Sequence, residues 1–306
     1  MFVGLPLLLY FGFLFWSSHR PQPAGIKREI FPGITYFREV KRTAPALVAH
    51  IVTIPLDSPK VSLFVTPADA PEAEKPLKAR TTSQFLTDFK VQIAINADFF
   101  YPWYDQNILQ YRPKQEDFQD LLSLPDKIWN YYPHPGDPVT TQGMGASKGQ
   151  AYNDTHERIA SYPTLYFTKD NRPSLSKPIG RVYNALSGGS LLLQNGIRPV
   201  VTDKPFYNER HPRTAIGLDK TRKWLILVVI DGRQPNFSEG ATITELTDIL
   251  EEHGAYIALN LDGGGSTALV MEGQSGEPIV LNTPIDHRLP GRQRPVANHL
   301  GIFVEK

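Results

Sequence analysis

Apolar and β-branched residues occur in short runs along the first half of the chain, and these runs predict strands. Residues 46–56 and 60–66 flank a turn sequence that contains Pro59, so we expect them to pair as a β-hairpin. Residues 81–89 carry apolar side chains at helical spacing and predict a short helix. Residues 91–95 then predict a short buried strand.

The second half of the chain is more regular. Four strands are predicted there, at residues 214–218, 224–230, 255–261 and 296–304. Thr242 and Glu245 have the spacing of a capping box, which starts a helix that Gly254 ends. The pattern therefore predicts an α+β fold: a mixed β-sheet core, short flanking helices, and Gly-rich loops that form a cleft at strand ends.

Residues 101–160 interrupt this pattern, because they are rich in Tyr, Trp and Pro and show little periodicity. A stretch of this length without clear elements is typical of a functional surface insertion. Its aromatic side chains either stack on sugar rings or pack the loop onto the domain. We therefore expect a linker and entry segment at residues 21–45 and one domain at residues 46–306 that carries this insertion.

The amino terminus carries an uncharged run of 15 residues, from Phe2 to Trp16, which indicates an export segment. The run is shorter than most membrane-spanning helices, but no basic residue precedes it and no small-x-small cleavage site follows it. Residues 1–20 are thus a signal peptide or a short anchor, and a buried helix is the alternative. We expect a periplasmic, extracellular or other cell-envelope location, with membrane association through this segment.

The composition of the chain argues against several classes of function. The chain has 306 residues and a net charge of +1, so it lacks the overall positive charge of a nucleic-acid-binding protein. It contains no cysteine, which excludes disulfides, thiol nucleophiles and Cys-ligated metals. The eight histidines show no zinc-binding spacing.

Two segments of the chain share a pattern in which a helix leads into a strand that ends in Asn-x-Asp. One ends at Asn96 and Asp98, and the other at Asn260 and Asp262. If both strands lie in one sheet, the two polar ends face the same cleft, since proteins commonly gather polar groups at strand ends.

The second of these ends opens into three glycines, Gly263, Gly264 and Gly265, followed by Ser266 and Thr267. Glycines let a ligand approach the backbone closely, and successive N–H groups suit an anion such as phosphate. The segment lacks the lysine of a P-loop. A tight turn would use the same glycines.

Charged residues at the predicted strand ends supply candidate chemistry. Arg213, beside Thr214 at the start of a strand, suits a phosphate or carboxylate, and Arg294 lies near the start of the last strand. Asp98, Asp231 and Asp262 supply the carboxylates that glycoside hydrolysis requires, whereas Glu245 is occupied in its capping box. The same carboxylates suit Ca²⁺ or Mg²⁺. Ser187 and Ser190 lack the surrounding G-x-S-x-G of a serine hydrolase.

Taken in order, these segments resemble the phosphodiester glycosidase family. The resemblance rests on six blocks: Asn96 to Phe100, Leu186 to Ser190 with Asn195-Gly196, Pro212 to Gly217, Asp231-Gly232-Arg233, Ala258 to Thr267, and Arg294 to Asn298. It covers residues 46–304 apart from the insertion. The chain departs from the family at Ala97-Asp98, where glycine and glycine or threonine are common, so Asp98 is an extra carboxylate.

The resemblance implies hydrolysis of a sugar-1-phosphodiester, which releases the sugar and leaves a phosphomonoester, with no cofactor required. Asp262 and Asp231 are the leading acid–base candidates, and Asp98 is a third. The residues expected to position the substrate are Asn96, Arg213, Thr214, Asn260, Gly263, Gly264, Gly265, Ser266, Thr267 and Arg294. Two alternatives remain open: an exported polysaccharide-binding or envelope-assembly protein, and a phosphodiesterase that uses a divalent metal.

Overall fold

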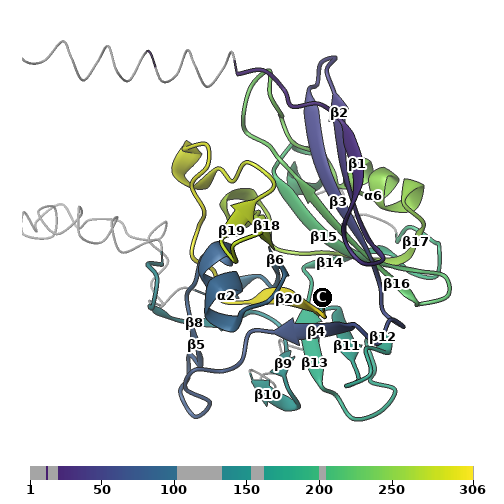
Figure 1. The fold of residues 1–306 in the computed structure, drawn as a ribbon, viewed down its shortest axis with the longest axis vertical. Coiled ribbons are helices and arrows are strands. Elements are labelled where there is room, and N and C mark those ends of the chain that lie inside the picture. The colour runs from purple at the N-terminus through teal and green to yellow at the C-terminus, as the bar shows by residue number, and fades with distance from the viewer. Residues whose placement is uncertain (1–11, 13–19, 102–132, 153–161, 200–204, 306) are drawn as a thin grey trace, which may run out of the picture.

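Antiparallel sheets make up most of the structure (Figure 1). The computed structural model describes residues 12, 20–101, 133–152, 162–199 and 205–305. Every pairing between its named strands is antiparallel, so the α+β class is confirmed in outline, but the expected mixed sheet is wrong. An apolar strand sequence does not specify the direction of its partner, and several of the pairs join segments far apart in the chain, so the pattern could not give the pairing.

The largest sheet has seven strands. In spatial order they are β1 (Ile26–Phe31), β2 (Ile34–Lys41), β3 (Leu47–Pro55), β16 (Trp224–Ile230), β15 (Arg213–Asp219), β17 (Ala255–Asn260) and β14 (Ser190–Leu193). Beyond Trp224, every residue of β16 is buried, because both faces of the central strands are covered. A strand covered on both faces has an unbroken apolar sequence rather than an alternating one.

Three smaller sheets complete the described strands. One contains β10 (Gln150–Tyr152), β9 (Gly145–Ser147), β13 (Asn184–Ser187), β11 (Thr164–Phe167) and β12 (Pro173–Leu175). Another contains β19 (Pro278–Val280), β18 (Leu269–Glu272), β6 (Ile93–Asn96), β20 (His299–Val304) and β4 (Val61–Val65). The smallest contains β5 (Leu77–Lys78), β8 (Pro138–Thr141) and β7 (Phe100–Tyr101).

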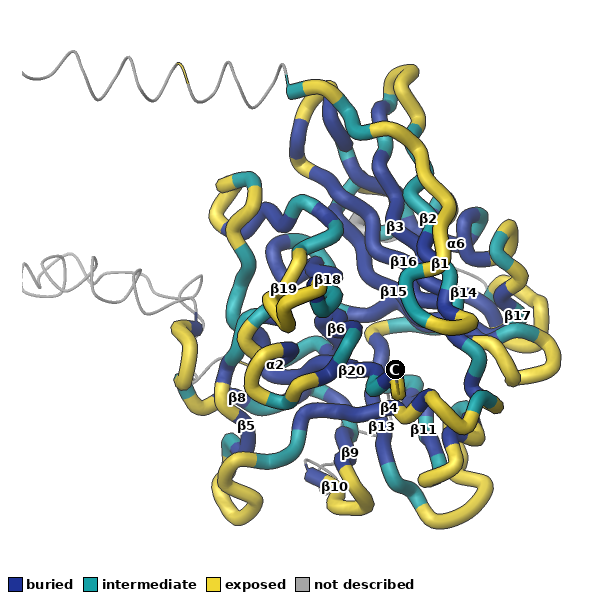
Figure 2. The backbone as a smooth tube through the Cα atoms, in the orientation of Figure 1, coloured by how far each residue is buried: buried dark blue, intermediate teal, exposed yellow. Residues whose placement is uncertain are grey.

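One apolar core joins the seven-stranded sheet to both five-stranded sheets, and Figure 2 shows the buried strands that surround it. Helix α6 (Ile243–Glu252) covers the other face of the large sheet, and α2 (Thr82–Phe89) packs on the sheet that contains β6. Both helices start with a capping box: the one at Thr242 was predicted from the sequence, whereas the one at Thr81 was not. The short elements α5 (Pro205–Asn208), η3 (Gly264–Ser266) and η4 (Asp286–Arg288) lie in connecting segments.

Two expectations change in the first part of the chain. Strands β3 and β4 do not form a hairpin, because β3 pairs with β2 and β16 while β4 pairs with β20. The turn between β3 and β4 leads the chain from the seven-stranded sheet into the five-stranded sheet that contains β4. The expected linker at residues 21–45 contains β1 and β2, which extend the large sheet. Of the insertion at residues 101–160, residues 102–132 and 153–161 lie outside the described residues, and strands β8 to β10 occupy the rest.

The two Asn-x-Asp strand ends meet, although their strands belong to different sheets. The N–H of Asp262 donates to the carbonyl of Ala97 at 2.9 Å. The Asn96 side chain accepts from the Thr214 hydroxyl at 2.9 Å and from the N–H of Ala268 at 3.1 Å. It also donates to the carbonyl of Asp262 at 2.5 Å. Asn96 therefore joins β6, β15 and the Gly-rich loop at one point.

This junction makes a stability prediction. Asn96→Ala leaves buried polar groups of Thr214, Asp262 and Ala268 without their partner, so we expect the free energy of unfolding to fall by about 2–4 kcal/mol. Thr214→Val removes only one of these hydrogen bonds and keeps the shape, and is expected to cost about 1 kcal/mol. Urea denaturation of both variants tests this order. Equal losses would contradict a junction centred on Asn96.

Candidate active site

Asp98 and Asp262 lie within electrostatic reach of each other at the junction, and the negative charge of Asp262 contributes to raising the pKa of Asp98. Asp98 is 1% exposed, whereas Asp262 is partly exposed. The sequence placed these residues far apart, in two echoing motifs, and the fold brings their carboxyl groups to one place. They form the carboxylate pair of the candidate site.

Asp98 is held from two sides. The N–H of Ser187 donates to one carboxyl oxygen and the Asn298 side-chain amide donates to the other. Asn298 is fixed in turn by the Tyr152 hydroxyl, which donates to it at 3.3 Å. Burial raises the pKa of Asp98 to about 8, although its hydrogen bonds oppose the shift. At neutral pH this carboxyl group therefore retains its proton.

Asp262 follows β17 directly and is the more accessible member of the pair. Burial raises its pKa to about 6, while the nearby Ser266 hydroxyl, the Arg294 charge and the N–H of Gly263 act in the opposite direction. At neutral pH Asp262 is mostly ionised while Asp98 is protonated. Two carboxyl groups whose environments separate their pKa values in this way suit acid–base work.

The glycines after Asp262 make room for protein groups. A Cβ on Gly263 would lie 2.8 Å from the carbonyl oxygen of Pro212, and one on Gly264, where φ is +63°, would lie 3.1 Å from Nη2 of Arg233. A Cβ on Gly265 would lie 2.5 Å from Nη2 of Arg294. We expected the glycines to admit a ligand. The structure shows that they admit two guanidinium groups, which lie against the loop.

Arg233 belongs to a cationic group at the adjoining ends of β15 and β16. Its Nη2 lies 3.5 Å from Nδ1 of His211. Burial is the main cause that lowers the pKa values of His211 and Arg213, and the positive charge of Arg233 lowers both further. Arg233 is exposed, whereas Arg213 is 1% exposed. The Arg213 guanidinium donates to the carbonyls of Ala241 and Glu209, at 3.0 and 2.9 Å. Arg213 thus supports the surrounding loops, and Arg233 is the accessible cation.

Arg294 approaches the loop from the carboxyl-terminal part of the chain. Its Nε donates to Asp286 at 2.8 Å, and Asp286 is buried. Nε of Arg292 lies 3.6 Å from the same carboxyl group. Asp286 therefore fixes the orientation of Arg294 beside Gly265.

Asp231 lies in a separate buried network. Its carboxylate accepts from the N–H of Thr283 at 2.7 Å and from the Asn282 amide at 3.2 Å, and it lies 3.2 Å from Nε2 of His50. The Tyr36 hydroxyl lies 2.8 Å from Nδ1 of the same histidine. Burial raises the pKa of Tyr36 to about 12, so its hydroxyl keeps its proton at neutral pH.

This network reaches the Gly-rich loop without exposing Asp231. Asn282 donates to the carbonyl of Thr267 at 3.2 Å and accepts from the N–H of Leu269 at 2.9 Å. Asp231 is 1% exposed. In the structure, Asp231 holds Asn282 and thereby the end of the Gly-rich loop. A direct catalytic role for Asp231 stays a prediction.

The remaining predicted residues line the same junction. Thr214 and Asn96 are fully buried and bond to each other, so their side chains fasten the site from beneath. Within the described residues, Oδ1 of Asn260 and Oγ1 of Thr267 are buried without a hydrogen-bond partner. Buried polar atoms rarely lack partners, so these two are candidates for contact with a bound molecule.

The sequence did not single out Arg233 as a binding residue. It follows Gly232 in the Asp-Gly-Arg block of the family resemblance, in which only Asp231 was a site candidate. Its backbone is left-handed, with φ of +58°, and its guanidinium lies against Gly264. Asn298 ends the last block of that resemblance and was not a site candidate either. Neither local sequence shows the contacts of these residues, because the contacts are made with segments distant in the chain.

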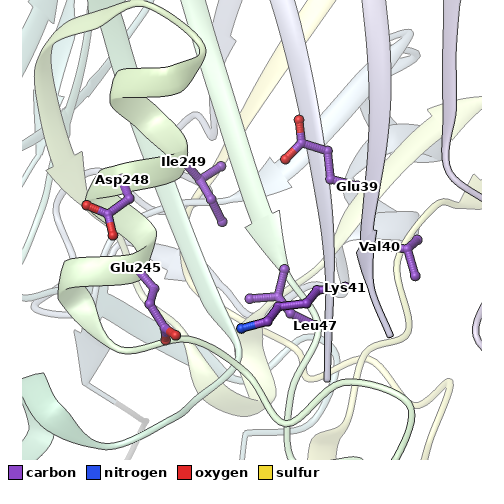
Figure 3. Close-up of a pocket in the computed structure, with 7 residues that line it drawn as sticks. All are labelled: Glu39, Val40, Lys41, Leu47, Glu245, Asp248 and Ile249. Carbon is purple, nitrogen blue, oxygen red and sulfur yellow. The ribbon is translucent and has the colours of Figure 1, made fainter. Parts of the chain in front are cut away.

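Other features of the described chain lie elsewhere. No group of three or more His, Asp or Glu side chains in the described ranges is arranged to hold a metal ion. A surface pocket of about 310 Å³ lies at the ends of β2, β3 and α6, and Figure 3 shows Glu39, Lys41, Leu47 and Glu245 among the side chains around it. It shares no lining residue with the Asp98–Asp262 pair. None of the described helices is both long and apolar enough to cross a membrane.

Comparison with known proteins gives one family. The family model described as phosphodiester glycosidase matches residues 89–303. No curated protein matches the sequence.

Three solved structures share the fold. A hypothetical protein from Synechocystis is 17% identical with a TM-score of 0.57; the match covers 92% of this chain and 64% of that one. The zebrafish N-acetylglucosamine-1-phosphodiester α-N-acetylglucosaminidase catalytic domain, auto-inhibited by its pro-peptide, is 19% identical with a TM-score of 0.58, covering 95% and 86%. A Burkholderia pseudomallei protein described as exported is 12% identical with a TM-score of 0.55, covering 84% and 74%.

The raised pKa of Asp98 predicts how stability depends on pH. An unfolded aspartate titrates near pH 4, so the stability contributed by the higher folded pKa is complete below about pH 4 and is lost as pH rises to about 8. Asp98→Asn removes this loss. Relative to wild type, the variant is expected to gain a few kcal/mol of unfolding free energy between about pH 5 and about pH 9.

Urea denaturation of both proteins across this pH range measures the difference. Asp69→Asn is the matched control, because the pKa of Asp69 is lowered by its bonds to Arg80 and Lys78 despite burial, so its contribution is lost as pH falls instead. A difference between Asp98→Asn and wild type that stays constant with pH would contradict the assignment of a protonated Asp98.

Proposed function

Since the chain belongs to the phosphodiester glycosidase family, we propose that it hydrolyses a sugar-1-phosphodiester at the bond between the anomeric carbon and the phosphate oxygen. The products are the free sugar and a phosphomonoester. The observation that carries the proposal is the pair Asp98 and Asp262, whose pKa values are separated. Two arginines from other segments lie against the Gly-rich loop that follows Asp262.

The two arginines suit the phosphate. Arg233 and Arg294 flank Gly264 and Gly265, and guanidinium groups bind phosphate oxygens through paired charge-assisted hydrogen bonds. As the bond to the sugar breaks, its electron pair moves to the departing phosphate oxygen. The arginines stabilise that charge where it develops, which is the most effective place for electrostatic catalysis.

Asp262 supplies the reactive carboxylate, because it is the accessible and mostly ionised member of the pair at neutral pH. It either removes a proton from the attacking water or first attacks the anomeric carbon itself. Asp98 keeps its proton and so avoids placing a second negative charge beside Asp262. A phosphate leaving group needs little protonation, so the buried Asp98 acts mainly by remaining neutral beside Asp262.

The proposal is tested with a soluble sugar-1-phosphodiester such as UDP-N-acetylglucosamine, within a panel of other sugars, in ¹⁸O water. Cleavage of the C–O bond places ¹⁸O in the released sugar. We expect Asp262→Asn to lower kcat by about 10²–10⁴-fold, with Asp219→Asn, in a surface turn, as the control. Label in the phosphate would mean P–O cleavage, and binding without turnover of any substrate would favour a binding protein. Loss of activity with EDTA would favour the metal-dependent alternative.

The same assay gives a pH prediction. Activity requires Asp262 ionised and Asp98 protonated, so kcat/KM is expected to rise with pH through about 6 and to fall through about 8. Asp98→Asn removes the group that titrates on the alkaline side, and the fall near pH 8 is expected to disappear while the rise remains. A profile whose alkaline limb is unchanged in Asp98→Asn would contradict this assignment.

The glycines give a further prediction. Gly265→Ala places a Cβ within 2.5 Å of Arg294 and 2.9 Å of Asp286, so it displaces the guanidinium from the loop. We expect kcat/KM to fall by about 10–100-fold, as for the loss of one group that stabilises the transition state. Gly180→Ala is the control, because its Cβ would meet only ordinary contact at 3.6 Å. Equal activity of the two variants would show that Arg294 is not needed at that position.

A further inference from the structure

The chain is fixed to the domain immediately after its apolar run. The Arg20 guanidinium donates to Gln234 at 2.6 Å and lies over the ring of Phe237, 3.6 Å from its centroid. Gln22 donates to the carbonyls of Phe237 and Lys41, at 2.7 and 3.0 Å. These contacts place residues 20–22 against the loop that follows β16 and against the end of β2.

Two arginines of β2 and its following turn hold the next two residues. Arg42 donates to the carbonyl of Pro23 at 3.3 Å, and Arg38 donates to the carbonyl of Ala24 at 2.8 Å. The segment 20–24 is therefore part of the folded domain. Side chains of β2 and of the loop after β16 hold these five residues against the domain.

This attachment point adjoins the candidate active site. Gln234, which binds Arg20, also donates to the carbonyls of Gly232 and Thr283, at 3.3 and 3.0 Å. Arg233 lies between Gly232 and Gln234 in the chain, and its guanidinium lies against Gly264. The loop that receives the amino-terminal segment is thus the loop that presents Arg233 to the proposed phosphate.

Only Ser17, Ser18 and His19 separate the apolar run from this attachment. A fully extended chain spans about 3.3–3.6 Å per residue, so a connection of this length reaches at most about 14 Å from Arg20. The short, polar connection is followed by folded chain and offers no small-x-small sequence for cleavage. The apolar run is shorter than a usual span, a mismatch that bilayer thinning and flanking basic residues accommodate at modest cost.

The charge of the neighbouring surface favours the same placement. Residues 20–45 contain six Lys or Arg residues against two Glu, although the whole chain carries only +1. Lys27, Arg28, Lys41 and Arg42 are exposed. Basic residues next to a membrane segment are attracted to anionic lipid by about 1 kcal/mol each.

We infer that the apolar run remains as a membrane anchor and that the enzyme acts on sugar-1-phosphodiesters whose other substituent is a lipid held in the same membrane. The anchor places the Arg233 loop close to the lipid surface, where the phosphate of such a substrate lies. The inference rests on the proposed function and adds to it the class of the group that remains on the phosphate.

The test uses the full-length chain in vesicles of phosphatidylcholine and phosphatidylglycerol. Two substrates carry the same sugar phosphodiester, one with a short soluble alcohol and the other with a long-chain lipid alcohol embedded in the vesicles. The comparison variant is Leu7→Asp, Leu8→Asp, Leu9→Asp, which removes the membrane affinity of the run and leaves residues 20–306 unchanged. Initial rates are measured for each protein on each substrate, and the mass of the recovered wild-type chain is determined.

We expect wild type and the triple variant to hydrolyse the soluble substrate equally, which also shows that both are folded. On the lipid-linked substrate the wild type is expected to be faster by about tenfold or more, because anchoring raises the effective concentration of the site at the surface. Equal rates on the lipid-linked substrate, or a recovered chain that lacks the run, would overturn the inference. Failure of wild type on the soluble substrate and on its lipid-linked counterpart would instead contradict the proposed function.

Discussion

The structure depends on one junction, where the ends of β6 and β17 meet although they belong to different sheets. The backbone bond from Asp262 to Ala97 and the fully buried amide of Asn96 hold this junction together. Apolar packing between the sheets brings the two strand ends near each other, and these directional bonds join them. Every group of the candidate site is positioned with respect to this point.

The junction also creates the electrostatic character of the site. It buries Asp98 and brings it within reach of Asp262, so that desolvation and mutual repulsion keep Asp98 protonated at neutral pH. On the other side of the Gly-rich loop, Arg233 and Arg294 lie where side chains on Gly264 and Gly265 would otherwise be. One loop therefore has a carboxylate at its start and two cations against it, which is the arrangement that the proposed hydrolysis would use.

Much of the fold follows from the sequence alone. The capping box at Thr242, the helical spacing of apolar residues in 81–89 and the unbroken apolar run of β16 are local signals, and they predicted these elements correctly. Sheet membership was not predictable, because β3 and β4 are adjacent in the chain but find partners far along it. The same limit applies to the site: the Asn-x-Asp motifs identified Asp98 and Asp262, whereas Arg233 and Asn298 gain their roles only from contacts across the fold.

The central claim is that Asp98 and Asp262 form one coupled pair, and ¹³C NMR titration of the aspartate carboxyl carbons tests it most directly. Both carboxyl groups are predicted to titrate above the ordinary range for aspartate, with Asp98 the higher, near pH 8, and Asp262 near pH 6. In Asp262→Asn the pKa of Asp98 is predicted to fall, because the neighbouring negative charge is gone. Ordinary pKa values for both groups, or an Asp98 titration that ignores the substitution, would contradict the account.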